Sequence, residues 1–376
     1  MNEDKSTRYR RLRRKAGILA VVARVGLLLT LLGFGFSPAL RDLSAEMALA
    51  AGVPELLRPS AEVALYALML AILVEVVVLP PIWYAEFVLD RRYGLSRRRA
   101  GDWARGHVTT TGIHLALWTA AAVVVYTAMR LWPTSWWMMA GVVFAGGTIA
   151  VTHLAPILVL PWLYHVAPLA RPGLRVRLED LTRRVGDPVM GILEWRLGSD
   201  PPRPNAALVG IGTTRRVLLT DALLADYSDD EIEVVLAHEL GHHAHKDIWK
   251  TIAYEGGVAT LACGAAHGAL GRVGPPVGVE SVSDVAGLPL FVLAAGSVVM
   301  LLGPVTNLMS RRHERRADQY ALEVTGNPGA LASGLRRVAA QRLAEERPSR
   351  LVEWLFYSHP PLSDRLAAAR RLSPPG

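Results

Sequence analysis

The sequence predicts a mainly α-helical integral membrane protein, in which a bundle of six spans carries a separate domain on the cytoplasmic side. Hydrophobic residues make up 51% of its 376 residues and the mean hydropathy is +0.27. This is too apolar for an ordinary soluble protein of that length. Six apolar stretches are long enough to cross a bilayer, and the arginines gather in alternate loops between them.

The six predicted spans each approach or exceed the roughly 20 apolar residues that crossing a bilayer requires. They lie near residues 16–36, 61–83, 108–131, 136–164, 251–270 and 285–307. The fifth is the weakest, because Glu255 and His267 interrupt it. The basic segment before the first span resembles the start of a signal peptide. Its apolar run is too long, however, and no A-x-A cleavage site follows, so we expect a membrane anchor.

The distribution of arginine indicates which side of the membrane each loop occupies. Two clusters precede the first span and follow the second: Arg8, Arg10, Arg11, Arg13, Arg14, Arg91, Arg92, Arg97, Arg98, Arg99 and Arg105. The positive-inside rule then places both termini and the segment 167–250 in the cytoplasm. Only four of the 41 basic residues are lysine. This composition suggests a GC-rich genome, so we expect a bacterial cell membrane.

The composition also excludes several classes of function. The net charge of +8 is explained by cytoplasmic loops, and no nucleic-acid-binding motif is present. The single cysteine, Cys263, excludes a disulfide framework and makes a cysteine-based metal site improbable. Arg24 and Glu75 fall inside predicted spans, where a charge is costly. Either they face a water-filled chamber, or Arg24 reaches the interface and Glu75 pairs locally.

The spans divide the chain into four parts. Residues 1–166 hold four spans, 167–250 form a cytoplasmic segment, 251–307 hold two spans, and 308–376 form a C-terminal segment. In the second part, charge and leucine alternate at helical spacing over 174–184, and 191–197 reads as a strand. Residues 205–210 and 216–219 read as two short strands joined by Gly212-Thr213-Thr214, a hairpin. An exposed edge of such a hairpin can hold an extended peptide by backbone hydrogen bonds.

The chemistry is concentrated in an H-E-x-x-H motif formed by His238, Glu239 and His242. The preceding Ser228 and Glu231 have the spacing of a capping box, which places the motif on a helix. Histidines four residues apart lie on one helical face and can bind one zinc ion, and the glutamate can act as general base. The alternative, a polar helical face without metal, fits poorly with the apolar run at 234–237.

A catalytic zinc site needs a third protein ligand. The best candidate is Glu314, just after the sixth span, with Asp318 one helical turn later to accept a hydrogen bond from a ligand histidine. His313 competes with Glu314, but adjacent residues on a helix do not share a direction. The other interpretation is a basic helix beside the membrane, with ion pairs only on its surface.

Several ordered blocks of this sequence resemble the type I CAAX prenyl proteases, which are integral-membrane zinc metallopeptidases of the gluzincin class. The blocks are Leu79-Pro80-Pro81-Ile82-Trp83-Tyr84, Glu86-Phe87-Val88, Tyr93-Gly94-Leu95, Asn205-Ala206, Arg215-Arg216-Val217-Leu218-Leu219, His238-Glu239-Leu240-Gly241-His242, Ser310-Arg311, Glu314, Ala317-Asp318, His359-Pro360-Pro361-Leu362 and Arg365-Leu366. The resemblance covers the chain from about residue 60 to its end. It implies a helical barrel around an intramembrane chamber, with a zincin-like metalloprotease domain.

The resemblance also implies a role for each matching residue. One zinc ion would be held by His238, His242 and Glu314, with Glu239 as general base. The substrate backbone would pair at Asn205 and Ala206, and His359 and Arg365 would lie near the metal, where His359 stabilises the oxyanion.

The sequence is therefore compatible with two classes of function. The first is a membrane-embedded zinc metalloendopeptidase, whose substrate is a lipidated C-terminal peptide, a precursor peptide with a leader, or a damaged membrane protein. The second is a non-enzymatic membrane transporter or scaffold with a structural or vestigial metal site. A structural site would be closed by a fourth protein ligand, for which only His313 and His359 are at hand.

Overall fold

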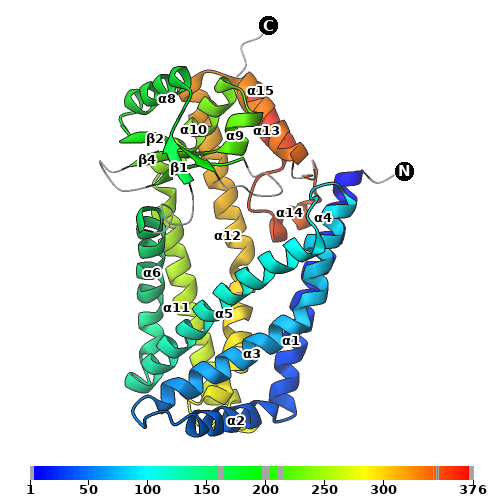
Figure 1. Cartoon of the computed structure of the whole chain (residues 1–376), viewed down its shortest axis with the longest axis vertical. Helices are drawn as coiled ribbons and strands as arrows, with labels where there is room; N and C mark the ends of the chain where they lie inside the picture. The colour runs from blue at the N-terminus through cyan, green and yellow to red at the C-terminus, as the bar shows by residue number, and fades with distance from the viewer. Residues whose placement is uncertain are drawn as a thin grey trace. The chain divides into compact units, whose positions relative to one another are not determined.

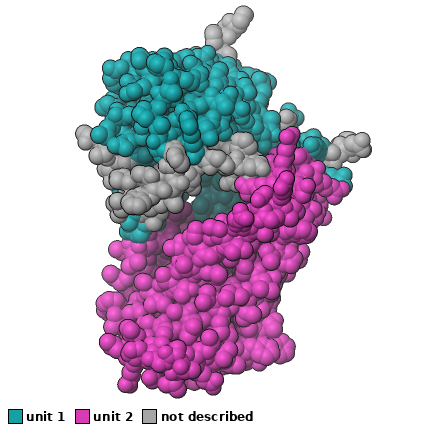
Figure 2. All heavy atoms as spheres, in the orientation of Figure 1, with its two compact units in different colours: residues 1–10, 146–253, 303–376 teal, residues 11–145, 254–302 magenta. Residues whose placement is uncertain are grey.

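The computed structural model describes residues 4–158, 165–196, 204–209, 215–341, 343, 345 and 347–371, with the side chains of 151–158 and 165 excepted. The chain forms two compact units (Figure 2). Unit 1 comprises residues 1–10, 146–253 and 303–376, and unit 2 comprises residues 11–145 and 254–302.

Unit 2 is built from long helices (Figure 1). Those that contribute to it are α1 (Lys5–Gly33), α2 (Phe36–Ala50), α3 (Arg58–Trp83), the π-helical turn η1 (Tyr84–Val88), α4 (Leu89–Arg92), α5 (Ala100–Leu131), α6 (Trp136–Leu158), α11 (Asp247–Val273), the 3₁₀ turns η3 (Pro275–Val277) and η4 (Val285–Gly287), and α12 (Leu288–Thr325). Helix α2 is not predicted by the sequence. It begins where Gly35, with φ of 73°, turns the chain away from α1.

The core of unit 2 holds large side chains from several helices. Tyr66, Leu70, Tyr126, Met129 and Trp136 are almost completely buried there. Outside this core, α1, α3, α5 and α12 expose many large apolar side chains. A soluble surface would not tolerate such extended apolar faces, whereas lipid does.

Four helices of the described part are long and apolar enough to cross a membrane: Lys5–Gly33, Arg58–Arg92, Ala100–Leu131 and Val285–Thr325. They coincide with the first, second, third and sixth predicted spans. The predicted span 136–164 falls on α6, whose described apolar stretch Trp136–Ala150 is shorter, and residues 159–164 lie outside the described residues. The predicted span 251–270 falls on α11. This helix is continuous, but Glu255 and His267 interrupt its apolar sequence, and it is not among the four.

Glu75 pairs locally within unit 2. Its Oε1 lies 2.8 Å from Nε2 of His107 on α5. The imidazole of His107 in turn stacks on Trp103, with ring centroids 4.8 Å apart. The structure thus shows the local pairing that was one of the two interpretations of Glu75.

Unit 1 contains a four-stranded sheet in the order β1-β2-β4-β3. The strands are β1 (His165–Pro168), β2 (Gly191–Arg196), β3 (Ala206–Val209) and β4 (Arg216–Thr220). Strands β3 and β4 are antiparallel, with Ala206 opposite Leu219, as the predicted hairpin requires. Its turn residues 210–214 lie outside the described residues. Strand β1 is not predicted by the sequence, and β2 runs parallel to β4.

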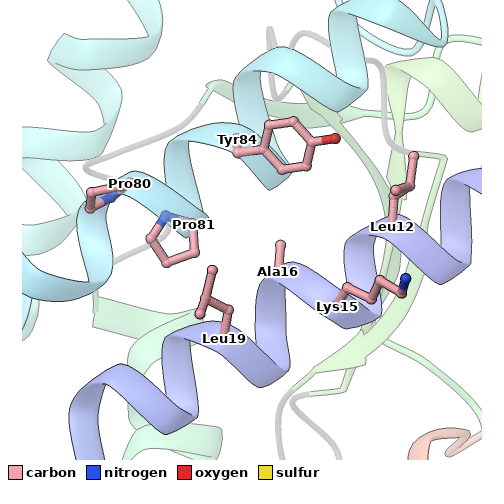
Figure 3. A pocket seen from close by; sticks show the side chains of 7 residues that line it. All are labelled: Leu12, Lys15, Ala16, Leu19, Pro80, Pro81 and Tyr84. Atoms are coloured by element: carbon pink, nitrogen blue, oxygen red, sulfur yellow. The ribbon is translucent and has the colours of Figure 1, made fainter. Parts of the chain in front are cut away.

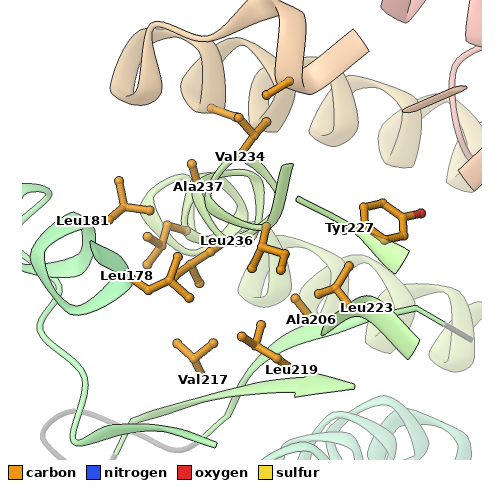
Figure 4. Close-up of a cluster of buried hydrophobic side chains, with 14 of the residues drawn as sticks. Leu178, Leu181, Ala206, Val217, Leu219, Leu223, Tyr227, Val234, Leu236 and Ala237 are labelled. Atoms are coloured by element: carbon orange, nitrogen blue, oxygen red, sulfur yellow. The ribbon is translucent and has the colours of Figure 1, made fainter. Parts of the chain in front are cut away.

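Helices pack on this sheet to form the core of unit 1 (Figure 4). Residues of α8 (Pro172–Arg184), α9 (Asp221–Asp226), α10 (Asp229–Ala244), α13 (Pro328–Gln341), α15 (Leu362–Arg371) and the C-terminal part of α12 contribute to this core. Helix α14 (Arg350–Phe356) belongs to the same unit and has no buried residue. Val217 and Leu219 of β4 face Leu236 and Ala237 of α10 in one buried cluster. The buried face of α10 therefore fixes the rotation of this helix about its axis.

Candidate metal centre

Helix α10 presents His238 and His242 on the same face. The helix starts with the predicted capping box, in which Ser228 and Glu231 each accept a hydrogen bond from the other's backbone N–H. One helical turn separates the two imidazoles, whose ring centroids are 4.8 Å apart and whose planes are perpendicular. Local sequence therefore suffices to aim two metal-binding side chains at one point.

Helix α12 brings Glu314 to the same point. Glu314 Oε2 lies 3.6 Å from His238 Nε2, and Oε1 lies 3.5 Å from His242 Nε2. One donor atom from each of the three residues lies within 4.8 Å of the other two. The two helices approach closely because residue 241 is glycine: a Cβ there would be 3.0 Å from the Cα of Ala317. The glycine of the motif is thus needed for packing.

A carboxylate lies against the Nδ1 atom of each histidine. His238 Nδ1 is 3.0 Å from Asp318 Oδ1, although the angle is not that of a hydrogen bond. His242 Nδ1 is 3.1 Å from Asp247 Oδ2. A carboxylate at Nδ1 favours the tautomer that carries its proton there and leaves Nε2 free to bind a metal. Both Nε2 atoms are those nearest Glu314.

Asp247 is a site residue that the sequence analysis does not identify. Its side chain is only 5% exposed and also lies 3.1 Å from Arg316, 3.5 Å from His313 and 3.6 Å from Lys250. Lys246, with φ of 55°, adopts a left-handed turn between α10 and α11 that returns the chain toward His242. The signal that could have found it is an aspartate five residues after the second histidine. His313 faces this carboxylate and, among the described residues, is not part of the group His238, His242 and Glu314 whose donor atoms converge.

The C-terminal part of the chain adds His359 and Arg365. Arg365 binds both carboxylate oxygens of Asp318, at 2.7 and 2.6 Å, and lies 3.6 Å from Glu314. His359 Nδ1 is 3.1 Å from Glu314 Oε2, and 59% of its side chain is exposed. The buried guanidinium of Arg311 holds this segment by donating to the carbonyl oxygens of Glu353 and Tyr357.

The electrostatics of the centre favour a cation. Burial lowers the pKa of His242, but Glu314 and Asp247 outweigh it and raise that pKa to about 9. Burial raises the pKa of Glu239, against the opposing effect of the two histidines. A carboxylate with a raised pKa is a stronger base than an ordinary one.

Of the predicted peptide-binding residues, Ala206 begins β3 at one edge of the sheet, and Asn205 directly precedes this strand. Strand β3 contacts α10. Thr220 donates its N–H to the carbonyl of Asn205, and Asn205 donates its N–H to Thr220 Oγ1. In an antiparallel ladder the next residue points its backbone groups the other way. The N–H and C=O of Ala206 therefore face the free edge, whereas the backbone groups of Asn205 are paired within the sheet.

Comparison with known proteins places this centre in a family. Residues 169–373 match peptidase family M48. The chain belongs to peptidase family M48. Residues 2–165 match a second description, the CAAX prenyl protease N-terminal region with five membrane helices. The M48 member is thus a multi-pass integral membrane metalloprotease, and the transporter or scaffold alternative is set aside.

Several relatives of this M48 member extend over most of its length. A Bacillus subtilis protein called uncharacterized metalloprotease YhfN is 24% identical over 313 residues, which cover 81% of this chain and 72% of the relative. The CAAX prenyl protease 1 of Saccharomyces cerevisiae is 25% identical over 312 residues, which cover 77% of this chain and 68% of the relative. The crystal structure of S. mikatae Ste24p superposes on this chain with a TM-score of 0.81 at 24% identity. The superposition covers 97% of this chain and 87% of the Ste24p chain. This superposition confirms the predicted mainly helical fold, and the two family matches supply its membrane region and its metalloprotease domain.

The residues present fit the metal that an M48 metalloprotease implies. Two imidazole nitrogens and one carboxylate form a donor set that suits zinc and leaves one position open. The described residues supply three donors within this reach, which is the number that a catalytic zinc site uses.

Proposed function

We propose that this M48 member is a zinc endopeptidase that hydrolyses a peptide bond in peptide or lipidated-peptide substrates. The observation that carries the proposal is the convergence of His238, His242 and Glu314 from two helices, with Glu239 between the histidines. One zinc ion would be held by these three ligands. When bound, zinc would polarise the scissile carbonyl and make water a better nucleophile near neutral pH.

Glu239 acts as general base in the proposed reaction. Its carboxylate accepts the proton of the attacking water as oxygen bonds to the carbonyl carbon of the peptide. It then donates this proton to the departing amine nitrogen as the C–N bond breaks. The raised pKa that burial gives Glu239 suits both transfers, because a group that first accepts and then donates a proton works best with a pKa closer to the operating pH.

We assign different roles to the two residues from the C-terminal segment. His359 is exposed beside Glu314 and can donate a hydrogen bond to the oxygen on which charge develops. Arg365 is committed to Asp318 by two hydrogen bonds, so it acts as a positioning residue for Asp318 and through it for His238.

The free edge of β3 is the proposed binding site for an extended substrate. The outward N–H and C=O of Ala206 pair with the substrate backbone, and the exposed side-chain amide of Asn205 contributes a further hydrogen bond. The similarity to CAAX prenyl protease 1 favours a prenylated or otherwise lipidated C-terminal peptide; a precursor peptide and a damaged membrane protein are the other options. From the arginine distribution, we propose that both termini and the centre face the cytoplasm of a bacterial cell.

The decisive experiment compares the wild type with Glu239→Gln. The amide keeps the size of the side chain but cannot take a proton, so we expect retained zinc and a loss of cleavage of about 10²–10⁴-fold. A fluorogenic farnesylated peptide and its unprenylated counterpart test the substrate class. Quantitative comparison of peptide termini in membranes from cells expressing each protein identifies natural substrates.

The matched control is Glu323→Gln, because Glu323 is an exposed carboxylate on α12 that accepts a hydrogen bond from Gln319. It should cleave like the wild type. Retained cleavage by zinc-loaded Glu239→Gln would refute the assigned role of Glu239. Equal cleavage of both peptides would refute a requirement for the lipid but not the proposed peptidase.

A further inference from the structure

A groove lies between α1 and the end of α3 in unit 2 (Figure 3). It encloses about 330 Å³, at the lower end of the range of about 300–1,000 Å³ for small-molecule sites. It is lined by Leu12, Lys15, Ala16, Leu19, Pro80, Pro81 and Tyr84. The first four follow helical spacing i, i+3, i+4 and i+7, so they form one continuous face of α1.

The shape of the groove comes from the two prolines. Pro80 and Pro81 lie inside α3 and lack the N–H that would continue its hydrogen bonding. The chain continues into the π-helical turn η1, and Tyr84 is its first residue. π-helical turns of this kind are frequent at functional sites. Leu19 remains 57% exposed, so the groove is open on the lipid-facing side of a membrane-spanning helix.

The two ends of the groove differ in chemistry. The Lys15 ammonium and the Tyr84 hydroxyl lie toward the Leu12 end, whereas Leu19 and the two prolines line the other end (Figure 3). Lys15 is exposed and forms no ion pair with any described residue. Arg11 lies one turn earlier on the same helical face and adds positive charge.

The acidic side chains nearest in sequence do not neutralise this end. Asp90 on α4 lies 3.5 Å from Arg13 and is thereby already paired. Glu86 is two residues from Tyr84, and residues so spaced on a helix do not share a face.

The depth of the groove matches the boundary between lipid headgroups and acyl chains. Lys15 directly precedes the predicted span 16–36, and the two prolines lie near the end of the span 61–83. Both positions belong to the side of the membrane with the arginine clusters, where anionic lipids are attracted. Basic pockets between membrane helices on this side bind anionic headgroups in other proteins.

We propose that this groove binds one anionic glycerophospholipid, with an acyl chain against Ala16, Leu19 and Pro81 and the phosphate beside Lys15. Charge complementarity selects an anionic over a zwitterionic headgroup, and the apolar end requires a chain. The site is independent of the metal centre and of the substrate proposed above.

Native mass spectrometry of the detergent-purified full chain can test this proposal with phosphatidylglycerol and phosphatidylcholine of identical chains. We expect one phosphatidylglycerol to bind more tightly than phosphatidylcholine. Lys15→Gln should weaken phosphatidylglycerol roughly fivefold and leave phosphatidylcholine unchanged. Ala16→Leu, which fills the apolar end, should weaken both lipids. A phosphatidylglycerol with a photoactivatable acyl chain should label peptides that contain residues 12–19 or 80–84.

Arg92→Gln is the matched control, because Arg92 is an exposed cation near the same membrane face that does not line the groove. It should change phosphatidylglycerol binding less than twofold. The proposal is overturned if Lys15→Gln binds like the wild type or if Arg92→Gln weakens binding equally. Equal binding of the two lipids, or displacement by millimolar inorganic phosphate alone, would also overturn it. Because Lys15 is exposed, its substitution tests the site even if Ala16→Leu misfolds.

Discussion

Asp247→Asn should weaken zinc binding although Asp247 is not itself among the three proposed ligands. The buried carboxylate lies 3.1 Å from His242 Nδ1 and 3.1 Å from Arg316, with His313 at 3.5 Å. Asparagine preserves the shape but removes the charge. It can also present its NH₂ group, which repels the protonated Nδ1 of the ligand histidine. The imidazole of His242 would then be held less firmly in the tautomer that binds metal.

The size of this effect follows from the role of such partners in metal sites. Loss of a carboxylate behind a ligand histidine typically costs 10- to 100-fold in metal affinity. The equivalent free energy is about 1.4–2.7 kcal/mol. Lys250→Gln is the control, because Lys250 is 47% exposed at 3.6 Å from Asp247. Exposed pairs contribute about 0–1 kcal/mol, so the zinc affinity of this variant should stay close to that of the wild type.

Competition with a fluorescent zinc chelator measures the affinity, and circular dichroism of each metal-free variant shows whether it remains folded. A zinc affinity of Asp247→Asn within twofold of the wild type would refute the proposed positioning of His242. A loss of equal size in Lys250→Gln would show that general electrostatics, and not the contact with His242, is responsible.

Three further predictions concern packing, substrate binding and pH. Gly241→Ala should lower the free energy of unfolding by about 1–3 kcal/mol and weaken zinc binding, because the new Cβ would press on Ala317. The control Gly257→Ala places its Cβ where no atom lies nearby, so thermal unfolding should show it to be neutral or stabilising. Ala206→Pro removes an outward N–H, so KM should rise while the unfolding temperature stays the same. Ala207→Pro, at the residue that pairs with Leu218, should lower the unfolding temperature. An equal fall in Ala206→Pro would contradict the assigned edge. Burial raises the pKa of Glu231. This effect is outweighed by hydrogen bonds from Ser228 and Ser333 and by the charge of Arg337, so the pKa lies below its ordinary value of 4.5. Its charge therefore stabilises the fold fully above that value and progressively less as the pH falls through the lowered pKa, and Glu231→Gln should flatten this acid loss in thermal unfolding.

Features governed by local periodicity could be predicted from the sequence. The capping box at Ser228 and Glu231 and the one-turn spacing of His238 and His242 need only a helix to acquire their geometry. Four of the six spans coincide with helices that are apolar and long enough to cross a membrane. Helix α11 forms but is not among these four helices, because Glu255 and His267 make its sequence less apolar.

Contacts between distant segments depended on the tertiary structure. Glu314 was the best candidate for the third ligand from the sequence, and packing of α12 on Gly241 brings its carboxylate within 3.6 Å of both histidines. The partners of Asp247, and the pairing that leaves Ala206 and not Asn205 with free backbone groups, have no counterpart in local pattern. The sequence by itself thus determined the reactive motif and the membrane helices, because helical and hydrophobic periodicity act over a few turns. Only the tertiary structure decided which charges meet around the motif, because those contacts join residues 5 to 80 positions apart and depend on how whole helices pack.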